Sequence, residues 1–193
     1  MSSTDEITER YLKRAIAEMN TLGSEIAAAA GPETPHVLGS GHPQGDIFLL
    51  KYLPQAAELQ EGVAFFGRSG KAVLKSLQRL RVDPTMIYGT NVVKLAGLEL
   101  GDAQAWLARE LHIVQPAIIV VMGEEAREFA NGIEFPLSSR IEAETGTLQE
   151  WTPTAQSIVT PDVDSSLDEE DAKRAFWDAF KVLGPWWAEQ PPY

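Results

Sequence analysis

The chain has 193 residues, with 28 acidic against 16 basic side chains, a formal net charge of −12, and no cysteine. Lack of cysteine excludes disulfides, thiolate-held clusters and a thiol nucleophile, and it fits a reducing cytoplasm. No apolar run reaches the ~20 residues that span a bilayer, the first residues lack the apolar core of a secretory signal, and the acidity argues against non-specific coating of nucleic acid. We therefore expect a cytoplasmic protein that does not span a membrane.

Apolar periodicity predicts helices and strands in alternation. In chain order we expect a helix over 4–30, a strand at 36–38, mostly irregular chain over 40–70, a helix over 71–81, a strand at 86–88, a helix over 102–114, a strand at 117–122, a helix over 124–130, a hairpin or covering ribbon over 141–151, a strand at 157–160, and a last helix, capped by Ser166 with Glu169, that runs to about 183. We expect one domain over 1–193, with an N-terminal helical part (1–35) and a C-terminal tail (184–193) that packs its aromatic residues back.

This order predicts a three-layer α/β/α sandwich with a central four-stranded parallel sheet. Ligands in such sheets bind at the carboxyl ends of the strands. We therefore expect four loops to meet there: 39–45, 90–94, 123–125 and 160–166.

The first two glycine-containing segments offer different chemistry. In the first, Ser40 and Gly41 precede His42, a candidate general base, and Asp46, a candidate acid or base. The plainer interpretation is a loop histidine without chemistry and an aspartate that caps a turn. In the second, Phe65 precedes Arg68, Ser69 and Lys71 at the start of a helix, an arrangement suited to a phosphate. The spacing of a Walker A loop is absent, which argues against a nucleoside triphosphatase.

The last two candidate segments follow strands. Asn91 can pair bidentately with the edge of a base, and Lys94 lies three residues later. Asp162 and Asp164 suggest a metal, but the calcium-loop pattern fails because Leu167 stands where glycine is needed. We therefore expect neither a metal nor a cofactor.

The charges are unevenly distributed along the chain. Residues 51–94 hold seven basic and three acidic side chains, whereas 141–172 holds nine acidic and no basic ones. Such segments are commonly solvated faces. The sharper interpretation is an anion-binding face within 65–94, and a possible contact with a protein partner through the acidic segment 141–172.

Over residues 36–183 the motifs resemble the uracil-DNA glycosylase superfamily, and most closely its iron–sulfur bacterial and archaeal branch. The residues that carry the resemblance are Gly39-Ser40-Gly41-His42-Pro43, Ala64-Phe65-Phe66-Gly67-Arg68-Ser69-Gly70, Thr90-Asn91-Val92-Val93-Lys94, Val121-Met122-Gly123 and Thr160-Pro161-Asp162-Val163. The resemblance implies an α/β sandwich in which Phe65 stacks on a base flipped out of DNA and Asn91 reads its edge, with Gly41 close to the base. It also implies that the loop containing Ser165 inserts beside the DNA.

The chain departs from that pattern at the groups that carry the reaction. On this alignment Ser40 stands where the branch has glutamate, Asp162 where it has histidine, and the cluster cysteines are missing. His42 with Asp46 is the replacement pair that we prefer.

Three functions remain open from the sequence. The first is a base-excision DNA glycosylase that hydrolyses the N-glycosidic bond of uracil or another deaminated base. The second is a catalytically inactive module that binds a nucleobase, a nucleotide or single-stranded DNA. The third is a protein-interaction domain on the same fold.

Overall fold

The computed structural model describes residues 3–97 and 99–191. In chain order its elements are α1 (Ser3–Ala30), β1 (Ser40–Gly41), β2 (Ile47–Lys51), α2 (Ala56–Glu61), α3 (Arg68–Leu80), the 3-10 turn η1 (Pro84–Met86), β3 (Ile87–Asn91), α4 (Leu100–Val114), β4 (Ile118–Met122), α5 (Glu124–Asn131), β5 (Gln149–Thr152), β6 (Ala155–Thr160), α6 (Glu170–Phe180) and α7 (Leu183–Ala188). Among these residues, no helix combines the length and apolar character needed to cross a membrane.

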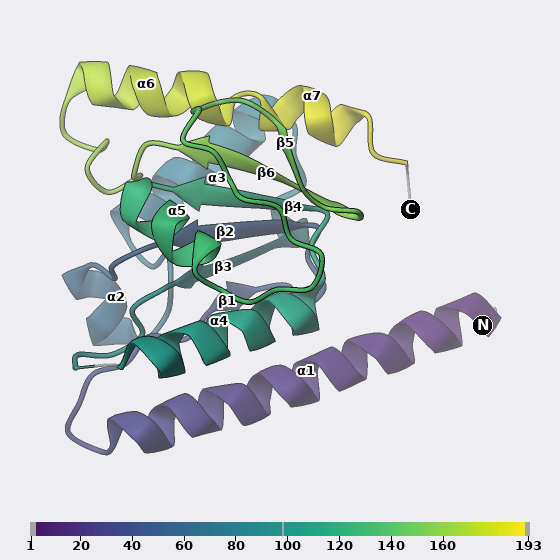
Figure 1. The fold of residues 1–193 in the computed structure, drawn as a ribbon, viewed down its shortest axis with the longest axis vertical. Coiled ribbons are helices and arrows are strands. Elements are labelled where there is room, and N and C mark those ends of the chain that lie inside the picture. The colour runs from purple at the N-terminus through teal and green to yellow at the C-terminus, as the bar shows by residue number, and fades with distance from the viewer. Residues whose placement is uncertain (1–2, 98, 192–193) are drawn as a thin grey trace.

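A six-stranded sheet forms the centre of the molecule, with the order β1-β3-β2-β4-β6-β5. The four inner strands run parallel, and the short strands β1 and β5 close the two edges in the antiparallel sense. Every residue of β2, β3 and β4 is buried, as expected where helices cover both faces of a parallel sheet. In Figure 1, α2 lies at the left of the sheet, and the start of α1 and the end of α7 lie at the right.

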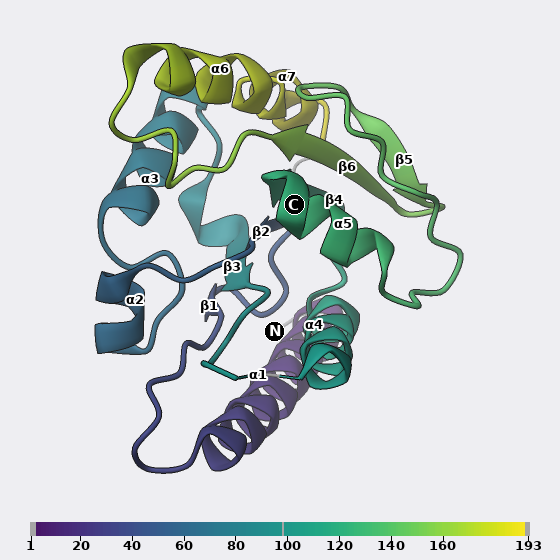
Figure 2. The ribbon, with the colours of Figure 1, turned by 60° about the vertical axis from the view of Figure 1, so that its left-hand side comes forward.

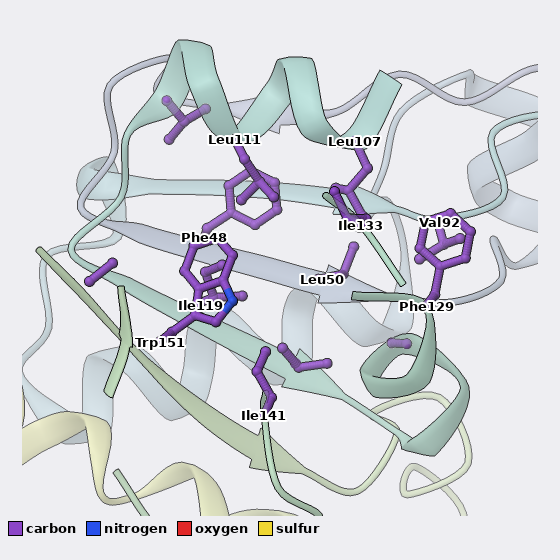
Figure 3. Packing of buried hydrophobic residues seen from close by; sticks show 14 of the residues in the cluster. Phe48, Leu50, Val92, Leu107, Leu111, Ile119, Phe129, Ile133, Ile141 and Trp151 are labelled. Atoms are coloured by element: carbon purple, nitrogen blue, oxygen red, sulfur yellow. The ribbon is translucent and has the colours of Figure 1, made fainter. Parts of the chain in front are cut away.

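Alternate residues of the inner strands supply two hydrophobic layers. Phe48 and Leu50 of β2 pack with Leu107 of α4 and Phe129 of α5 on one face, as Figure 3 shows. Ile47 and Leu49 of the same strand point to the opposite face, where they pack against α3, α6 and α7. The alternation follows from the two-residue period of a strand. Figure 2 shows the helices that cover these two faces, with α3 and α6 on one side of the sheet and α4 on the other.

The helix α1 lies outside α4 instead of on the sheet (Figure 1). Its buried residues Leu22 and Ile26 pack with Leu95 and Trp106 in a third, smaller cluster. The sequence-based helix over 4–30 thus matches the observed bounds closely.

Two sequence-based expectations are wrong in the first third of the chain. Residues 36–38 make only isolated bridges, from His36 to Leu95 and from Leu38 to Val63, and do not form a sheet strand. The strand that we missed, β2, is the one paired with both β3 and β4, and it lies with α2 inside the stretch 40–70 that we expected to be irregular. Glycine and proline flank β2 closely, and those flanks concealed its five buried residues.

Other boundaries and caps also differ from the prediction; for example, the last helix, expected to run to about 183, ends at Phe180 and is followed by the separate helix α7. The helix α3 begins at Arg68, three residues early, because Gly67 serves as its N-cap. The ribbon expected over 141–151 ends as β5, which forms a hairpin with β6. The predicted capping by Ser166 is wrong: its hydroxyl donates to the Asp162 carbonyl, and the N-cap of α6 is Glu169.

The expected C-terminal tail contains a helix as far as it is described. Trp186 in α7 is buried, and its indole N–H donates to Gln156 Oε1 at 2.7 Å. The aromatic side chains of this segment therefore pack back on the sheet layer. Residues 192 and 193 lie outside the described part of the chain.

Candidate functional site

The carboxyl ends of the parallel strands define one end of the sheet, at Lys51, Asn91, Met122 and Thr160. A pocket of about 370 Å³ lies at this end, between the segments that follow β2, β4 and β6. Its lining comprises Tyr52, Leu53, Gln55, Met122, Gly123, Glu124, Glu125, Ala126, Asp162, Asp164 and Ser165. This is where the fold class places a ligand.

A buried ionic network lies next to this pocket. The ammonium of Lys51, the last residue of β2, donates to Glu58 Oε2 at 2.5 Å and to Asp164 Oδ2 at 2.6 Å. The side chains of Lys51 and Glu58 are fully buried, and that of Asp164 is 10% exposed. Buried charges require such pairing, because an unpaired ion in the interior costs several kcal/mol. We call Lys51, Glu58 and Asp164 the Lys51 network.

The same network reaches the two residues that were predicted to bind a base. Glu58 Oε1 accepts a hydrogen bond from the Phe65 backbone N–H at 2.5 Å and a longer one from Asn91 Nδ2 at 3.5 Å. The Lys51 ammonium lies 5.4 Å from the centroid of the Phe65 ring. Phe65 and Asn91 therefore do converge, and Glu58 and Lys51 lie with them.

Phe65 is held in an unusual conformation. Its φ of 59° is in the left-handed region, which bulky residues rarely adopt and which costs of order 1–3 kcal/mol. Its ring packs directly over Gly89 of β3, where an added Cβ would lie 2.7 Å from Phe65 Cδ2. The strand glycine thus makes room for the ring, and the strained backbone directs the ring toward the sheet.

The Asn91 amide is closed off from solvent. The residue is 1% exposed, and its Oδ1 is buried without a hydrogen-bond partner among the described residues. Asp164 Oδ1 is buried and unpartnered in the same sense. Two acceptor oxygens without donors therefore lie at the Lys51 network, one on its member Asp164 and one on Asn91, whose amide contacts Glu58.

The loop after β6 is held together by its own aspartate. Asp162 Oδ2 accepts from the Ser165 backbone N–H at 2.8 Å, and the Asp162 carbonyl accepts from the Ser165 and Ser166 hydroxyls. Asp162 also packs against Gly123, where an added Cβ would lie 3.1 Å from its own Cβ. The Asp162 carboxylate thus has a local structural partner, whereas Asp164 faces the network.

The loop containing His42 lies at the other end of the sheet. Ser40 and Gly41 form β1, opposite Gly89 and Tyr88, and the His42 backbone N–H donates to the carbonyl of Ile87, the first residue of β3. The Asp46 carbonyl accepts from the backbone at the start of β4. Four strand steps of about 3.3 Å separate this end from the carboxyl end, so His42 and Asp46 lie about 13 Å along the sheet from Asn91.

The expected meeting of all four loops is therefore wrong for 39–45. Ser40 is also engaged elsewhere, because its hydroxyl donates to the Ala64 carbonyl at 2.8 Å. Gly41 has a φ of 110°, and an added Cβ would lie 2.1 Å from the Ile87 carbonyl oxygen. Its glycine character is explained by this close approach of β1 to β3.

The predicted phosphate-binding residues fall into two groups. Arg68 and Lys71 are exposed on α3, where Arg68 pairs with the exposed Asp168 at 2.5 Å. Ser69 is 2% exposed, and its hydroxyl has no partner among the described residues. Lys94 is fully buried, so it is not placed to meet a phosphate at the surface.

Lys94 belongs to a second buried network on the α4 side of β3. Its ammonium donates to Thr90 Oγ1 at 2.6 Å and to Glu110 Oε1 at 3.0 Å. The Tyr88 hydroxyl donates to the same Glu110 oxygen at 2.8 Å. Burial and the adjacent Glu110 carboxylate raise the pKa of Tyr88 well above its ordinary value.

The rim of the pocket at the carboxyl ends is acidic. Glu124 and Glu125, at the start of α5, line it together with Asp162 and Asp164. Arg127 pairs with Glu124 at 2.5 Å and lowers the pKa of its carboxyl, which keeps Glu124 ionised. No basic side chain lines this pocket. The anion-binding face expected within 65–94 therefore does not surround the pocket at the carboxyl ends.

Neither a metal nor an iron–sulfur cluster fits this site. Within residues 3–97 and 99–191 no three histidine, aspartate or glutamate side chains are grouped so that they could hold a metal ion. The chain has no cysteine to supply a thiolate ligand for a cluster.

Sequence reasoning missed Lys51, Glu58 and the partner role of Asp164. A local signal was present, because Lys51 directly follows the apolar run Ile47–Leu50, and a lysine at the end of a buried strand needs a partner. Neighbouring residues could not reveal that this partner is Asp164, because Asp164 lies 113 positions further along the chain.

Comparison with known proteins agrees with the fold and the motifs. A model of the uracil DNA glycosylase superfamily matches residues 38–181. A type-4 uracil-DNA glycosylase of Archaeoglobus fulgidus is 23% identical over 171 residues, which cover 83% of this chain and 86% of that protein. One from Sulfurisphaera tokodaii is 28% identical over 105 residues, 50% of this chain and 48% of that protein. These relationships support a DNA glycosylase-like function, and the chain belongs to the uracil-DNA glycosylase superfamily.

Proposed function

We propose that this chain is a glycosylase-like protein whose base site is closed by the Lys51 network. We propose further that it does not release uracil from DNA. One observation carries the proposal. The Lys51 ammonium bridges Glu58 and Asp164 beside the Phe65 ring, while Asn91 is left 1% exposed. A base could not stack on Phe65 and pair with Asn91 unless this network moved.

Hydrolysis of an N-glycosidic bond needs more than a base pocket. It needs a group that positions water at the sugar and a donor that stabilises the departing base anion. Asp162 is bonded within its own loop, and Lys51 already donates to two carboxylates. His42 and Asp46 lie toward the amino end of the parallel strands, away from the pocket. None of the residues predicted to be catalytic is therefore free at the pocket to fill either role.

The charge at the pocket argues in the same direction. Phosphates of a DNA duplex would approach a rim that carries Glu124, Glu125 and Asp162. Like charges repel, and salt screens this repulsion only beyond the Debye length, which is about 8 Å at physiological ionic strength. Duplex DNA is therefore a poor ligand for this mouth.

The proposal is tested by an excision assay. Purified protein is incubated with single- and double-stranded oligonucleotides that carry uracil, hypoxanthine or xanthine, and abasic sites are revealed by alkaline cleavage. An active uracil-DNA glycosylase serves as the control for the substrates. We expect no abasic sites from the uracil oligonucleotides above the level given by Asn91→Ala. Uracil release that Asn91→Ala abolishes would refute the proposal.

A second candidate is a nucleobase-binding module whose pocket opens when the network is released. The unpartnered Asn91 Oδ1 and Asp164 Oδ1 favour it, because two acceptors without donors can receive the N–H groups of a base edge. Titration calorimetry with free uracil, hypoxanthine and xanthine tests it on the parent and on Lys51→Ser. Binding that appears only in Lys51→Ser supports a latent pocket, and absence of binding in both proteins excludes this candidate.

A further inference from the structure

An apolar pocket of about 250 Å³ lies between α3 and the edge of the sheet formed by β1 and β3. Its lining comprises Ser40, Gly41, Leu49, Val63, Ala64, Phe65, Phe66, Gly70, Val73, Leu74, Leu77, Pro84, Ile87 and Gly89. These residues include no charged side chain and one hydroxyl, that of Ser40. Phe65 lines this pocket and also borders the base site described above, whereas neither Lys51 nor Asn91 belongs to the lining.

The rim of this pocket exposes large hydrophobic side chains. Val63 is 40% exposed, Phe66 47% and Leu74 46%, although each lines the pocket. A scattered apolar residue on a surface needs no explanation, whereas several gathered around one hollow mark a binding site. Covering this surface would gain about 25 cal/mol per Å² of apolar area removed from water.

The outer surface of α3 beside the pocket is basic. Between Gly62 and Val82 the chain carries five basic residues and no acidic one, although its net charge is −12. Two of these five have partners: Arg68 pairs with Asp168, and Arg79 lies 4.1 Å from the centroid of the Trp177 ring. The other three, Lys71, Lys75 and Arg81, are exposed and form no ion pair within the described part of the chain.

Helical spacing places part of this charge next to the hollow. Lys71 precedes the pocket residue Leu74 by three positions, which puts it on the face of α3 that carries Leu74, and Arg81 is the C-cap residue that directly follows α3. The nearest acidic side chain in sequence, Asp83, is engaged by the backbone N–H and the hydroxyl of Thr85. The pocket therefore combines an apolar hollow with a positive border.

The interior of the pocket discriminates between two classes of negatively charged ligand. A nucleobase placed there would bury N–H and C=O groups, but the Ser40 hydroxyl already donates to the Ala64 carbonyl. Each polar group left unpaired costs about 1–3 kcal/mol. An aliphatic or phenyl side chain has no such groups to satisfy. The chemistry therefore favours a peptide over a nucleic acid.

We infer that this surface binds an acidic, extended peptide segment of a partner protein. One aliphatic or aromatic side chain of the peptide enters the apolar pocket, and its carboxylates meet Lys71, Lys75 and Arg81. The inference does not depend on whether the base site is closed, because Phe65 borders both sites but no residue of the Lys51 network lines this pocket.

The experiment uses short synthetic peptides of known composition. The probe is a fluorescent peptide of aspartates and glutamates around one phenylalanine, and the reference peptides replace that phenylalanine by alanine or the acids by lysines. Binding is followed by fluorescence anisotropy, and the site by amide chemical-shift changes. We expect the phenylalanine peptide to bind at least about tenfold more tightly than the alanine peptide, since a fully buried ring contributes of order 1.5–3 kcal/mol.

Variants test both halves of the surface. Leu74→Ser should weaken binding about as much as removing the phenylalanine, and Lys71→Glu with Lys75→Glu should weaken it at least about threefold and reduce its salt dependence. Leu100→Ser is the matched control, because Leu100 is 63% exposed at the start of α4 and lies outside the pocket. Thermal unfolding checks that each variant is folded.

Three results would overturn the inference. The first is no binding of the acidic phenylalanine peptide up to about 1 mM, the weak limit for a specific contact. The second is equal affinity for the phenylalanine and alanine peptides. The third is a single-stranded oligonucleotide that binds more tightly than the peptide and shifts the same amides. None of these measurements involves cleavage of a glycosidic bond. Failure of this inference is therefore distinguishable from failure of the proposed function in the excision assay.

Discussion

Replacing Lys51 by methionine should destabilise the protein strongly. Methionine keeps the length of the side chain but removes the charge, which leaves the buried carboxylates of Glu58 and Asp164 without their shared cation. Breaking a buried ion pair by removing one partner costs about 3–5 kcal/mol. For a chain of this size each kcal/mol lowers the melting temperature by about 2–4 °C, so Lys51→Met should lower it by about 6–20 °C.

The measurement is urea unfolding of Lys51→Met and its parent, followed by tryptophan fluorescence. The slope of the free energy against urea must stay unchanged, so that the shift of the midpoint reports stability alone. Arg68→Met is the matched control, because it breaks a pair of equal length whose side chains are 69% and 72% exposed. That control should lose less than about 1 kcal/mol.

The reasoning about the network is refuted if the free energy of unfolding of Lys51→Met lies within about 1 kcal/mol of that of the parent, which is the small change expected for the exposed control. A double-mutant cycle refines the test. Lys51→Met combined with Asp164→Asn should lose less than the sum of the two single changes, because the second change removes a charge that the first leaves unpaired.

Three further outcomes follow from the structure. Lys94→Met should cost about 3–5 kcal/mol in urea unfolding, because it strands the Glu110 carboxylate. The Lys94→Met substitution should leave the affinity for any anionic ligand unchanged in anisotropy titrations. A loss of that affinity without destabilisation would contradict the placement of Lys94 in the interior. The raised pKa of Tyr88 means that the folded state holds its proton while the unfolded chain releases it above about pH 10; stability should therefore fall as the pH rises past that value, and Tyr88→Phe should reduce the fall in urea midpoint. Trp186→Ala should cost about 3–5 kcal/mol by differential scanning calorimetry, because it empties a buried site and removes the bond to Gln156; a change below about 1 kcal/mol would show that α7 is dispensable.

The candidate site shows how far local sequence reasoning extended. The segments around Phe65 and Asn91 were singled out from their motifs, and the structure brings the Phe65 backbone N–H and the Asn91 side-chain amide to the same glutamate. Their surroundings were not foreseen, because Glu58 lies in a helix that local composition concealed. The prediction that His42 lies at the carboxyl ends of the parallel strands failed because it assumed that the residues before His42 form a parallel strand. Instead β1 runs antiparallel, and the chain turns at the opposite end of the sheet.

The sequence by itself determined the elements whose pattern is local. The apolar run of β4, the periodic faces of α1 and α4, and the lack of cysteine follow from residue order and composition, and the α/β class follows from their alternation. Only the tertiary structure decided which charges are buried. Lys51 and Lys94 follow apolar residues, but the sequence does not show what neutralises them; unlike the exposed Lys71, their ammonium groups meet carboxylates from distant segments. The cost of burying a charge depends on those partners. The burial of Lys51, Glu58 and Asn91 was therefore fixed by the packing, whereas the basic residues of α3 and the total charge of the chain are already visible in the sequence.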